Sequence, residues 1–351
     1  MTNRIISFTD IHYGLKRNSV EHNKDCDQFI DWVINKAKEN NIKVCAVLGD
    51  WHHNRHTINI ETLTYSHRGM YKLNQYFDTV YFIVGNHDMY YRETRDVNSL
   101  VIADGLDKFV IVDKPLHIDE MLFMPWLVDD EWKEIKNMKA KYIFGHFELP
   151  TFFLNSMIRM PNNNELDISA FDKDSYVYSG HFHKRQSQGN VRYIGNAFPH
   201  TFDDTDDDER GCMILDRTTS EVEYHTWDNA PKYRKYDYDA LKGNEDSILS
   251  GVSKIHAKIM YNSSEQTAIQ MNIYREMLKD NYDFRVVDLI DIATTRIIEK
   301  DSDGNIISEG IDTESELELI EDVNNATIKQ LSKIESDEYS VPLLIQLYRE
   351  L

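Results

Sequence analysis

Five short polar clusters hold the residues of this sequence whose types and spacing could do chemistry. Their side chains are carboxylates, imidazoles and one amide, and none is a thiol. In chain order the clusters are Asp10-Ile11-His12, Gly49-Asp50, Gly85-Asn86-His87-Asp88, Gly145-His146 and Gly180-His181-Phe182-His183. Oxygen and nitrogen ligands of this kind suit Mn²⁺, Fe²⁺ or Zn²⁺, whereas structural zinc sites are typically built with cysteine. The clusters therefore predict a centre for divalent metal ions.

Such a centre has a specific use when it holds two ions. Two divalent ions roughly 3.5–4 Å apart share a carboxylate, lower the pKa of a water and neutralise phosphate oxygens, which is the chemistry of phosphate ester hydrolysis. A separate acid then protonates the leaving oxygen. His181 and His183 would share one face of a strictly extended strand, so we expect both to serve the same pair of ions. A single histidine is more often a core or surface residue, but five clusters in this order favour the metal centre.

Alternating strands and helices must position these clusters. Apolar runs predict strands at residues 4–9, 43–48 and 79–84, and apolar residues at helical spacing predict helices at 23–39 and 60–77. This alternation predicts a parallel α/β core, and the carboxyl ends of its strands are the usual place for a site. Each cluster comes at the end of a predicted strand.

The chain beyond Asp107 carries shorter strand patterns with shorter connections. We expect this set to form a second sheet packed on the first, which gives an α/β fold with a two-sheet sandwich flanked by helices. The candidate strands are residues 109–112, 121–124, 141–144, 175–179, 191–194, 212–215 and 221–226.

The part of the chain that carries the clusters ends near Ala230-Pro231. Residues 232–251 have the composition of a linker, and residues 252–293 predict one compact β-α-β unit. The remaining residues are polar and acidic, with helical patterns toward the end. We therefore predict three parts, which are residues 1–230 with the metal centre, 231–295 as a small β-α-β domain, and 296–351 as an acidic linker with a helical C-terminal tail.

Composition and charge limit the class of protein. The 351 residues are 41% hydrophobic and 28% charged, as in a soluble globular protein, and no apolar run is long enough to span a membrane. The cysteines form no CxxC pair and the first residues resemble no secretory signal, so we expect reduced thiols in a cytosolic protein. The formal net charge of −21 argues against an autonomous nucleic-acid binder. However, residues 301–351 hold thirteen Asp and Glu against three Lys and Arg, a net of −10, so nearly half of the excess lies in the tail.

Cationic residues stand beside the clusters. They are Lys16, Arg17, His52, His53, Arg55, His56, Arg92, Arg95, Lys184 and Arg185. If the clusters converge, these side chains form a basic rim that suits a phosphodiester polyanion, and the alternative is an ordinary solvated surface. The acidic run of residues 203–209 lacks the spacing of a calcium loop, so we expect a flexible, solvated loop there. The sequence has no GxxxxGK(S/T) phosphate loop, so the chain should not hydrolyse ATP itself.

Together the five clusters resemble those of the calcineurin-like metallophosphoesterase superfamily, over about residues 1–200. Within it the chain is similar to the SbcD-type DNA repair nucleases, the nuclease subunit of an SMC-like recombination complex. Its size and acidic tail resemble the version carried by large tailed bacteriophages. The resemblance implies a two-metal DNA phosphodiesterase, an exonuclease and endonuclease with Mn²⁺ as the expected metal. It also implies work in DNA recombination and double-strand-break repair, in the host-cell cytoplasm if a phage encodes the chain, with residues 231–295 as a capping domain that contacts DNA.

The resemblance also implies roles for individual residues. The first metal ion would be held by Asp10, His12 and His181, the second by Asn86, His146 and His183, and both by a bridging Asp50. His87 would donate the proton to the leaving oxygen or position the phosphate, and Asp88 would orient it. The family often has a histidine shortly after the bridging aspartate. His53 fits that place better than His52, although the doubled histidine leaves both open.

Partners and alternative functions remain to be weighed. The apolar residues within 341–351 predict a helix that packs either on this chain's own domain or, as the resemblance implies, on an SMC-like ATPase subunit. The resemblance also implies a homodimer. An alternative function is a calcineurin-like phosphoesterase for small phosphodiesters or phosphoproteins, although the GDxVDRG wording of Ser/Thr phosphatases is absent at Gly49-Asp50. A third alternative is a regulatory or assembly subunit without activity, and the complete ligand set speaks against it.

Overall fold

The first sheet of the computed structural model contains the parallel strands that the sequence predicted. The structure describes residues 3–153, 159–160, 166–292, 296–300 and 306–311. Four strands lie parallel and side by side, namely β1 (Arg4–Phe8), β2 (Val44–Val47), β3 (Thr79–Ile83) and β4 (Phe109–Val112). Antiparallel β11 (Gly211–Asp216) and β12 (Glu221–Thr226) extend the sheet beyond β1, which gives the order β12-β11-β1-β2-β3-β4.

The second sheet also has a parallel centre with antiparallel edges. Its central strands are β6 (Met121–Met124), β7 (Tyr142–His146), β8 (Tyr176–Gly180) and β10 (Val191–Tyr193). β5 (Leu116–Ile118) and β9 (Gln186–Gln188) close the two edges, in the order β5-β6-β7-β8-β10-β9. The α/β fold with two sheets is therefore confirmed.

The membership of the sheets differs from the prediction in one respect. The strand patterns after Asp107 were all expected in the second sheet, but β4, β11 and β12 belong to the first. β11 pairs with β1, where Arg4 lies opposite Asp216. The pattern of apolar residues in a strand reports which faces are buried and does not identify the neighbouring strand, so only the folded chain decides this assignment.

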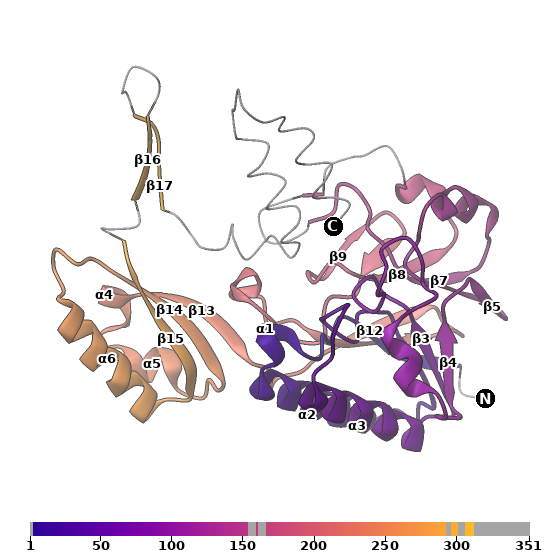
Figure 1. Ribbon diagram of the computed structural model, residues 1–351, viewed down its shortest axis with the longest axis horizontal. Helices are drawn as coiled ribbons and strands as arrows, with labels where there is room; N and C mark the ends of the chain where they lie inside the picture. The colour runs from indigo at the N-terminus through magenta and orange to yellow at the C-terminus, as the bar shows by residue number, and fades with distance from the viewer. Residues whose placement is uncertain (1–2, 154–158, 161–165, 293–295, 301–305, 312–351) are drawn as a thin grey trace. The chain divides into compact units, whose positions relative to one another are not determined.

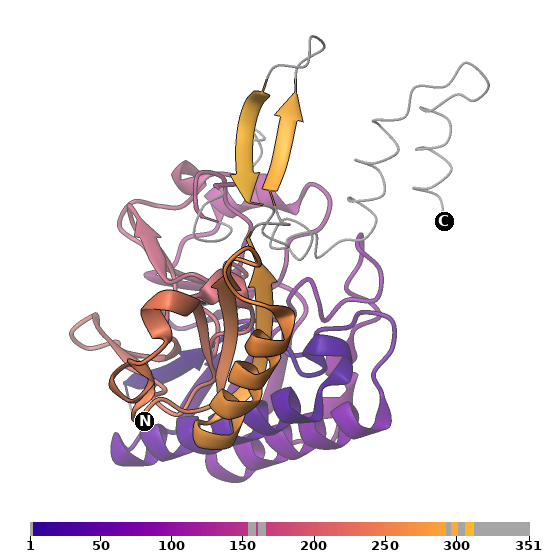
Figure 2. The ribbon, with the colours of Figure 1, turned by 90° about the vertical axis from the view of Figure 1, so that its left-hand side faces the viewer.

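Helices α2 (Val20–Glu39) and α3 (Ile60–Tyr76) run side by side along one face of the first sheet (Figures 1 and 2). Phe29 and Val33 of α2 pack in one apolar cluster with Val47 and Phe82 of the sheet. On the opposite face of this sheet, Ala46 and Ile83 share a second cluster with Phe123 and Phe144 of the second sheet. The two sheets therefore face each other, and the helices cover the outside of the first.

Short helical turns lie in the connections between these elements. They are α1 (Leu15–Asn18), η1 (Ser99–Ala103), η2 (Glu131–Asn137), η3 (Ile168–Ala170) and η4 (Phe202–Asp204). Within the described part of the chain, none of the helices combines the length and the apolar composition that crossing a membrane requires.

A third sheet follows the two that face each other. β13 (Lys232–Asp237), β14 (Ile255–Tyr261) and β15 (Phe284–Asp291) form it in that order, with α6 (Ala268–Asn281) between β14 and β15 in the chain. The predicted β-α-β unit is therefore present. The expectation of a linker at residues 232–251 is wrong, because β13, α4 (Tyr238–Leu241) and α5 (Glu245–Leu249) occupy it.

The end of the described chain is a two-stranded antiparallel sheet of β16 (Arg296–Lys300) and β17 (Ile306–Ile311), where an acidic linker was expected. The predicted C-terminal helices lie outside the described residues. Two compact units can be distinguished, one with residues 1–235, 245–257 and 278–287, and the other with 236–244, 258–277 and the residues from 288 onward. The division into parts at residues 230 and 295 stays a prediction.

Candidate metal centre

The carboxyl ends of five strands bring the polar clusters together within the first unit. Asp10 and His12 follow β1, Asp50 follows β2, and Asn86 with His87 follows β3; His146 ends β7, and His181 and His183 follow β8. Because the strands of both facing sheets end at this place, residues far apart in the sequence meet there. Three sets of possible ligand atoms lie within 4.8 Å of one another, and they are Asp10-His12-His183, Asp50-His146-His181 and His12-His53-His87.

We call Asp10, His12 and His183 the first group. Asp10 Oδ1 lies 3.8 Å from His12 Nε2 and 3.9 Å from His183 Nε2. The other carboxylate oxygen of Asp10 accepts hydrogen bonds from the Thr9 hydroxyl at 2.7 Å and from the backbone N–H of His181 at 3.0 Å. His146 Nε2 is 4.0 Å from the same Oδ1 atom. One oxygen is thus fixed by the protein while the other faces three imidazoles.

We call Asn86, His146 and His181 the second group. Asn86 Oδ1 lies 3.0 Å from His146 Nε2 and 3.2 Å from His181 Nδ1. Asp50 lies between the two groups, because its Oδ2 is 3.3 Å from His146 Nε2 and 3.8 Å from His12 Nε2. This is the position that a bridging carboxylate requires.

The geometry corrects the expected pairing of two histidines. His183, and not His181, lies beside Asp10 and His12, while His181 lies beside Asn86 and His146. The expected order came from the resemblance, which implied His181 for the first ion and His183 for the second. His181 directly follows β8 with φ of 88°. This left-handed backbone breaks the alternation of side chains along the strand, and the two imidazoles enter different groups.

The donor set fits divalent cations. Asp10 Oδ1 and both ring nitrogens of His12 are buried and make no hydrogen bond to any described residue. Buried polar atoms in this state are rare and costly unless a ligand satisfies them. Oxygen and nitrogen ligands about 2.0–2.2 Å from one cation lie roughly 3–4 Å from each other, which matches the separations in both groups. Two divalent ions are therefore the cofactors that these residues could hold.

Backbone strain is concentrated in the same residues. Asp10, His12 and Asp50 all have φ between 50° and 54°. Residues other than glycine rarely adopt this left-handed conformation, and it persists where the surroundings hold it and often where function needs it. Gly49 also has a positive φ of 102°, and a Cβ at this position would collide with the His146 ring. The chain thus turns sharply before Asp50 and passes close to a ligand.

Two buried histidines that the sequence did not point to hold this strained backbone. His22 Nε2 donates to the carbonyl oxygen of His12 at 2.9 Å, and His200 Nε2 donates to that of Asp10 at 2.8 Å. Neither residue lies beside a polar cluster or a predicted strand end. No pattern in the sequence signals them, because their role depends on contacts that only the fold creates.

Charges within the centre are strongly coupled. Burial disfavours a charged His146, but the carboxylates of Asp50 and Asp10 outweigh it and raise the pKa of His146 to about 9. Asp50 is buried as well, yet the nearby imidazoles of His146 and His87 hold its pKa well below the usual value. Burial, with His87 beside it, lowers the pKa of His12 far below that of an ordinary histidine.

His87 and His53 form a stacked pair at the edge of the first group. Their ring centroids are 5.3 Å apart with an angle of 18°, and both rings approach His12 edge-on. His87 Nδ1 donates to the carbonyl oxygen of His53 at 2.8 Å, so proton exchange with a substrate would fall to Nε2. His52 lies elsewhere, since its ring nitrogens contact the hydroxyls of Ser66 and Ser99 at 2.7 Å and burial lowers its pKa to about 3. The preference for His53 over His52 therefore agrees with the geometry.

Asp88 acts differently from the expectation that it orients His87. Its carboxylate accepts four hydrogen bonds of 2.9–3.1 Å from backbone N–H groups, those of Asp50, Trp51, His52 and Gly85. The His53 carbonyl orients His87 instead. Asp88 thus ties the loop after β2 to the loop after β3. Burial, with the neighbouring Asp50 charge, raises the pKa of Asp88 to about 7.

The expected basic rim is smaller than predicted. Arg95 is 8% exposed and forms a bidentate pair with Glu131 at 2.6–2.7 Å. Arg185 donates to the carbonyl of Ile194 and stacks on Tyr224. These cations, together with the buried His52, stabilise the fold rather than face a substrate.

The acidic run of residues 203–209 is also ordered rather than a free loop. Asp204 is 4% exposed and accepts from the His200 backbone N–H at 2.7 Å, while Asp207 pairs with the buried Arg210 at 2.6 Å. Because His200 donates to the Asp10 carbonyl, this loop supports the backbone of the metal centre indirectly, through His200.

Comparison with known proteins shows what this chain is similar to. The chain is 25% identical to "Exonuclease subunit 1" of Enterobacteria phage T4 over 332 residues, which cover 92% of each protein. The solved structure of the nuclease MPE of Pseudomonas putida is 16% identical with a TM-score of 0.29, over 54% of this chain and 66% of that one. The phosphoesterase Yfce of E. coli is 12% identical with a TM-score of 0.33, over 62% and 96%. A family model described as calcineurin-like phosphoesterase matches residues 3–185, more than half of the sequence, and the chain therefore belongs to this family of metal-dependent hydrolases.

Proposed function

We propose that this chain is a two-metal DNA phosphodiesterase, a Mn²⁺-dependent exonuclease and endonuclease. The observation that carries the proposal is the convergence of carboxylate, amide and imidazole atoms in two groups with Asp50 between them. Two ions held this way match the requirement for hydrolysis of a phosphate diester.

In this proposal Asp10, His12 and His183 would hold one ion, Asn86, His146 and His181 would hold the other, and Asp50 would serve both. When bound, the ions supply Lewis acidity toward the phosphate and activate a water. His87 donates a proton to the departing ribose oxygen through Nε2, since its Nδ1 is held by the His53 carbonyl. His53 positions His87 by that contact and by stacking on its ring.

DNA as the substrate is supported by the loop that follows His87. Tyr90 and Tyr91 are 41% and 50% exposed, and their ring centroids lie 4.8 Å apart. His56 lies against Tyr90 at 5.1 Å. Exposed aromatic rings are a common platform for the bases of single-stranded nucleic acid. The printed name of the phage T4 relative, an exonuclease, points the same way.

The proposal extends to partners and location. The relative is named as a subunit, which supports a multiprotein assembly, and we propose an SMC-like ATPase that binds the C-terminal helices expected within residues 296–351. A homodimer, a role in DNA recombination and double-strand-break repair, and the cytoplasm of the host cell complete the proposal. The buried Cys26, Cys45 and Cys212 are unpaired thiols, as a reducing compartment requires.

A nuclease assay tests this function. Purified chain is incubated with end-labelled duplex and single-stranded DNA and with Mn²⁺, Mg²⁺ or Ca²⁺, each with and without the candidate ATPase. We expect cleavage of DNA that is fastest with Mn²⁺. A nitrophenyl phosphodiester and a phosphopeptide are assayed in parallel. Rapid hydrolysis of either small substrate while DNA stays intact under every condition would replace the nuclease by the calcineurin-like alternative.

A further inference from the structure

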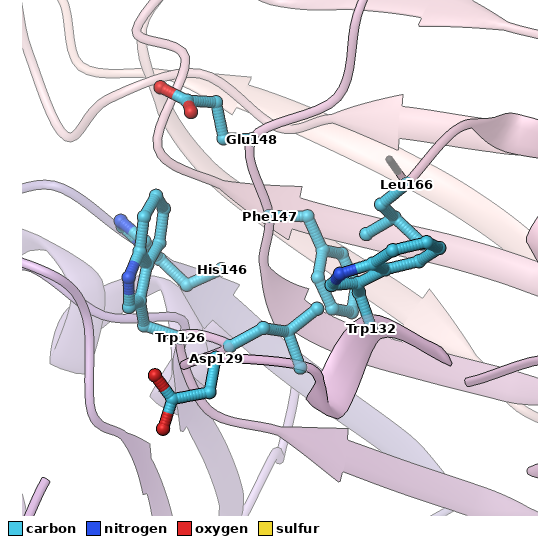
Figure 3. A pocket seen from close by; sticks show the side chains of 8 residues that line it. Trp126, Asp129, Trp132, His146, Phe147, Glu148 and Leu166 are labelled. Atoms are coloured by element: carbon cyan, nitrogen blue, oxygen red, sulfur yellow. The ribbon is translucent and has the colours of Figure 1, made fainter. Parts of the chain in front are cut away.

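A half-open cavity of about 110 Å³ lies directly beside the second group (Figure 3). It is lined by Trp126, Leu127, Asp129, Trp132, His146, Phe147, Glu148 and Leu166. This volume is several times what a single water needs, and the walls offer flat apolar rings. One of the lining residues, His146, is also a proposed metal ligand, so the cavity and the metal centre are continuous.

Trp126 forms the wall nearest to the metal centre. Its ring centroid lies 5.0 Å from that of His181 and 6.0 Å from that of His146. Its backbone N–H donates to the Val84 carbonyl at 2.8 Å, and its carbonyl accepts from Arg95 at 2.6 Å. Since Arg95 is itself buried and paired, the backbone that carries the indole is held in place.

The opposite wall is apolar and well packed. Phe147 and Leu166 are 1% and 6% exposed and belong to one apolar cluster, against which Trp132 packs. In Figure 3 these three side chains gather across the cavity from Trp126 and His146. Two walls with aromatic rings can hold a flat heterocycle by stacking, which is sequence-tolerant because every base has a π-face.

Carboxylates stand at the rim of the cavity. Asp129 and Glu148 lie on opposite sides of it, and Glu148 Oε1 also accepts from His181 Nε2 at 3.3 Å. Carboxylates repel a phosphate and accept hydrogen bonds from the amino groups of bases, as Asp and Glu do with the N4 amino group of cytosine. The chemistry of the rim therefore favours a nucleobase over a second phosphate.

We propose that this cavity receives the base of the nucleotide next to the scissile phosphate, stacked on Trp126, with one of the two rim carboxylates, Asp129 or Glu148, accepting from its amino group. The inference rests on the proposed function, because the metal centre fixes the phosphate from which the base extends. It assigns Trp126 as a substrate-binding residue and gives the enzyme a preference among bases.

The test compares oligonucleotides that carry a normal or an abasic nucleotide at each position around the cleaved bond, with Mn²⁺ present. We expect one abasic position to slow cleavage by the wild type about tenfold, the effect of losing one stacked base. For Trp126→Ala the ratio between normal and abasic substrate should fall to about one, while Trp126→Phe keeps most of it. Equal rates for the two substrates with the wild type, or an unchanged ratio in Trp126→Ala, overturn the proposal.

Two controls keep the result specific. Tyr71→Ala removes an exposed aromatic ring of α3 that lines neither the cavity nor the metal centre, and it should keep the wild-type ratio. Titration calorimetry with Mn²⁺ alone should give two bound ions in Trp126→Ala, and a lost ion would assign Trp126 to the metal centre instead. If the wild type cleaves no DNA at all, the proposed function fails. Cleavage without any abasic effect defeats only the base cavity.

The carboxylates of Asp129 and Glu148 predict which base the enzyme prefers in the cavity. Cytosine and thymine have the same ring size, but only cytosine carries an amino group, so we expect cytosine at the identified position to be cleaved severalfold faster. Asp129→Asn should reduce this preference, while the ratio between the thymine and the abasic substrate, which reports stacking alone, stays unchanged. Equal cleavage of the cytosine and thymine substrates by the wild type would show that the carboxylates do not recognise the base.

Discussion

The first and second groups of the metal centre have similar ligands but different neighbours. Around the first group, His53, His87 and His200 lie against His12 with ring centroids 4.9–5.7 Å away. Around the second group, the neighbours of His181 are the Trp126 indole and the Glu148 carboxylate. The first group thus has two imidazoles at its edge, those of His53 and His87, that are candidates for proton exchange, while the second borders a surface that can bind a flat ring.

This difference suggests a division of labour around a shared carboxylate. Proton transfer requires an imidazole close to the reacting oxygen, and the first group has two candidates at its edge. Recognition requires an open surface with rings and acceptors, which the second group borders. Asp50 contacts both groups, so its loss should affect metal binding, catalysis and base recognition together. A substitution beside the first group should affect catalysis alone, and one beside the second group should affect recognition alone.

The largest effect is expected from Asp50→Asn. An amide contributes less charge to each ion, so we expect at least one Mn²⁺ to be lost and DNA cleavage to fall on the order of 10³-fold. Titration calorimetry measures the number of bound ions, and a nuclease assay measures the rate. A variant that binds two ions and cleaves at the wild-type rate would show that Asp50 does not join the two groups.

His87→Ala sharpens the distinction between metal binding and chemistry. We expect both ions to remain bound while the turnover number falls by about 10²–10⁴-fold, the usual contribution of a general acid. His117→Ala is the matched control, since His117 is an exposed histidine of β5 outside the centre. Loss of a metal ion in His87→Ala, with normal cleavage at saturating Mn²⁺, would contradict the role of His87.

Asp88→Asn tests whether the two groups depend on a common support. The four hydrogen bonds from backbone N–H groups would be weakened, and the new amide N–H would face donors, so the free energy of unfolding should fall by about 3 kcal/mol. Urea denaturation measures this, with the exposed Asp96→Asn as control. If Asp88→Asn keeps the stability of the wild type but loses turnover, Asp88 takes a direct part in catalysis instead.

The smallest effect is expected at Asp25 on α2, which belongs to neither group. Asp25 accepts from Lys254 and Arg285, each with a hydrogen bond of 3.0 Å. Asp25→Asn should lower the free energy of unfolding at pH 7 by about 1–2 kcal/mol, without changing metal binding or the preference for base. Changed metal binding in this variant would show that the scaffold and the centre are not independent.

The same residue predicts a pH dependence. Burial disfavours the charged carboxylate, but the hydrogen bonds and charges of Arg285 and Lys254 outweigh it and lower the pKa of Asp25. A lowered pKa means that the ionised form stabilises the fold. This stabilisation is complete above the unfolded pKa of about 3.9 and is lost as the pH falls through the lower folded value. The stability difference between wild type and Asp25→Asn should therefore shrink below about pH 4, and a constant difference across that range would contradict it.

Much of the centre was predictable because its signals are local. A strand pattern followed by Asp, His or Asn identifies the end of a strand, and such ends converge in parallel sheets. This reasoning pointed to the five clusters, whereas the individual roles of their residues came from the resemblance to the family. Both failed where the outcome depends on a contact made in the fold. The resemblance placed His181 and His183 in the opposite groups and made Asp88 orient His87, although the Asp88 carboxylate accepts from four backbone N–H groups. The residue pattern placed Arg95 at a surface, although it is paired with Glu131.

The sequence by itself determined the alternation of strands and helices, the ligand types and therefore a chemistry of divalent ions, because these depend on residues close together in the chain. Only the tertiary structure decided which strands share a sheet, that His22 and His200 support the strained backbone of the first group, and that Trp126 and Glu148 border the second. The physical reason is that such contacts join residues separated by long stretches of chain. Their positions follow from packing and from single backbone angles rather than from any repeating pattern.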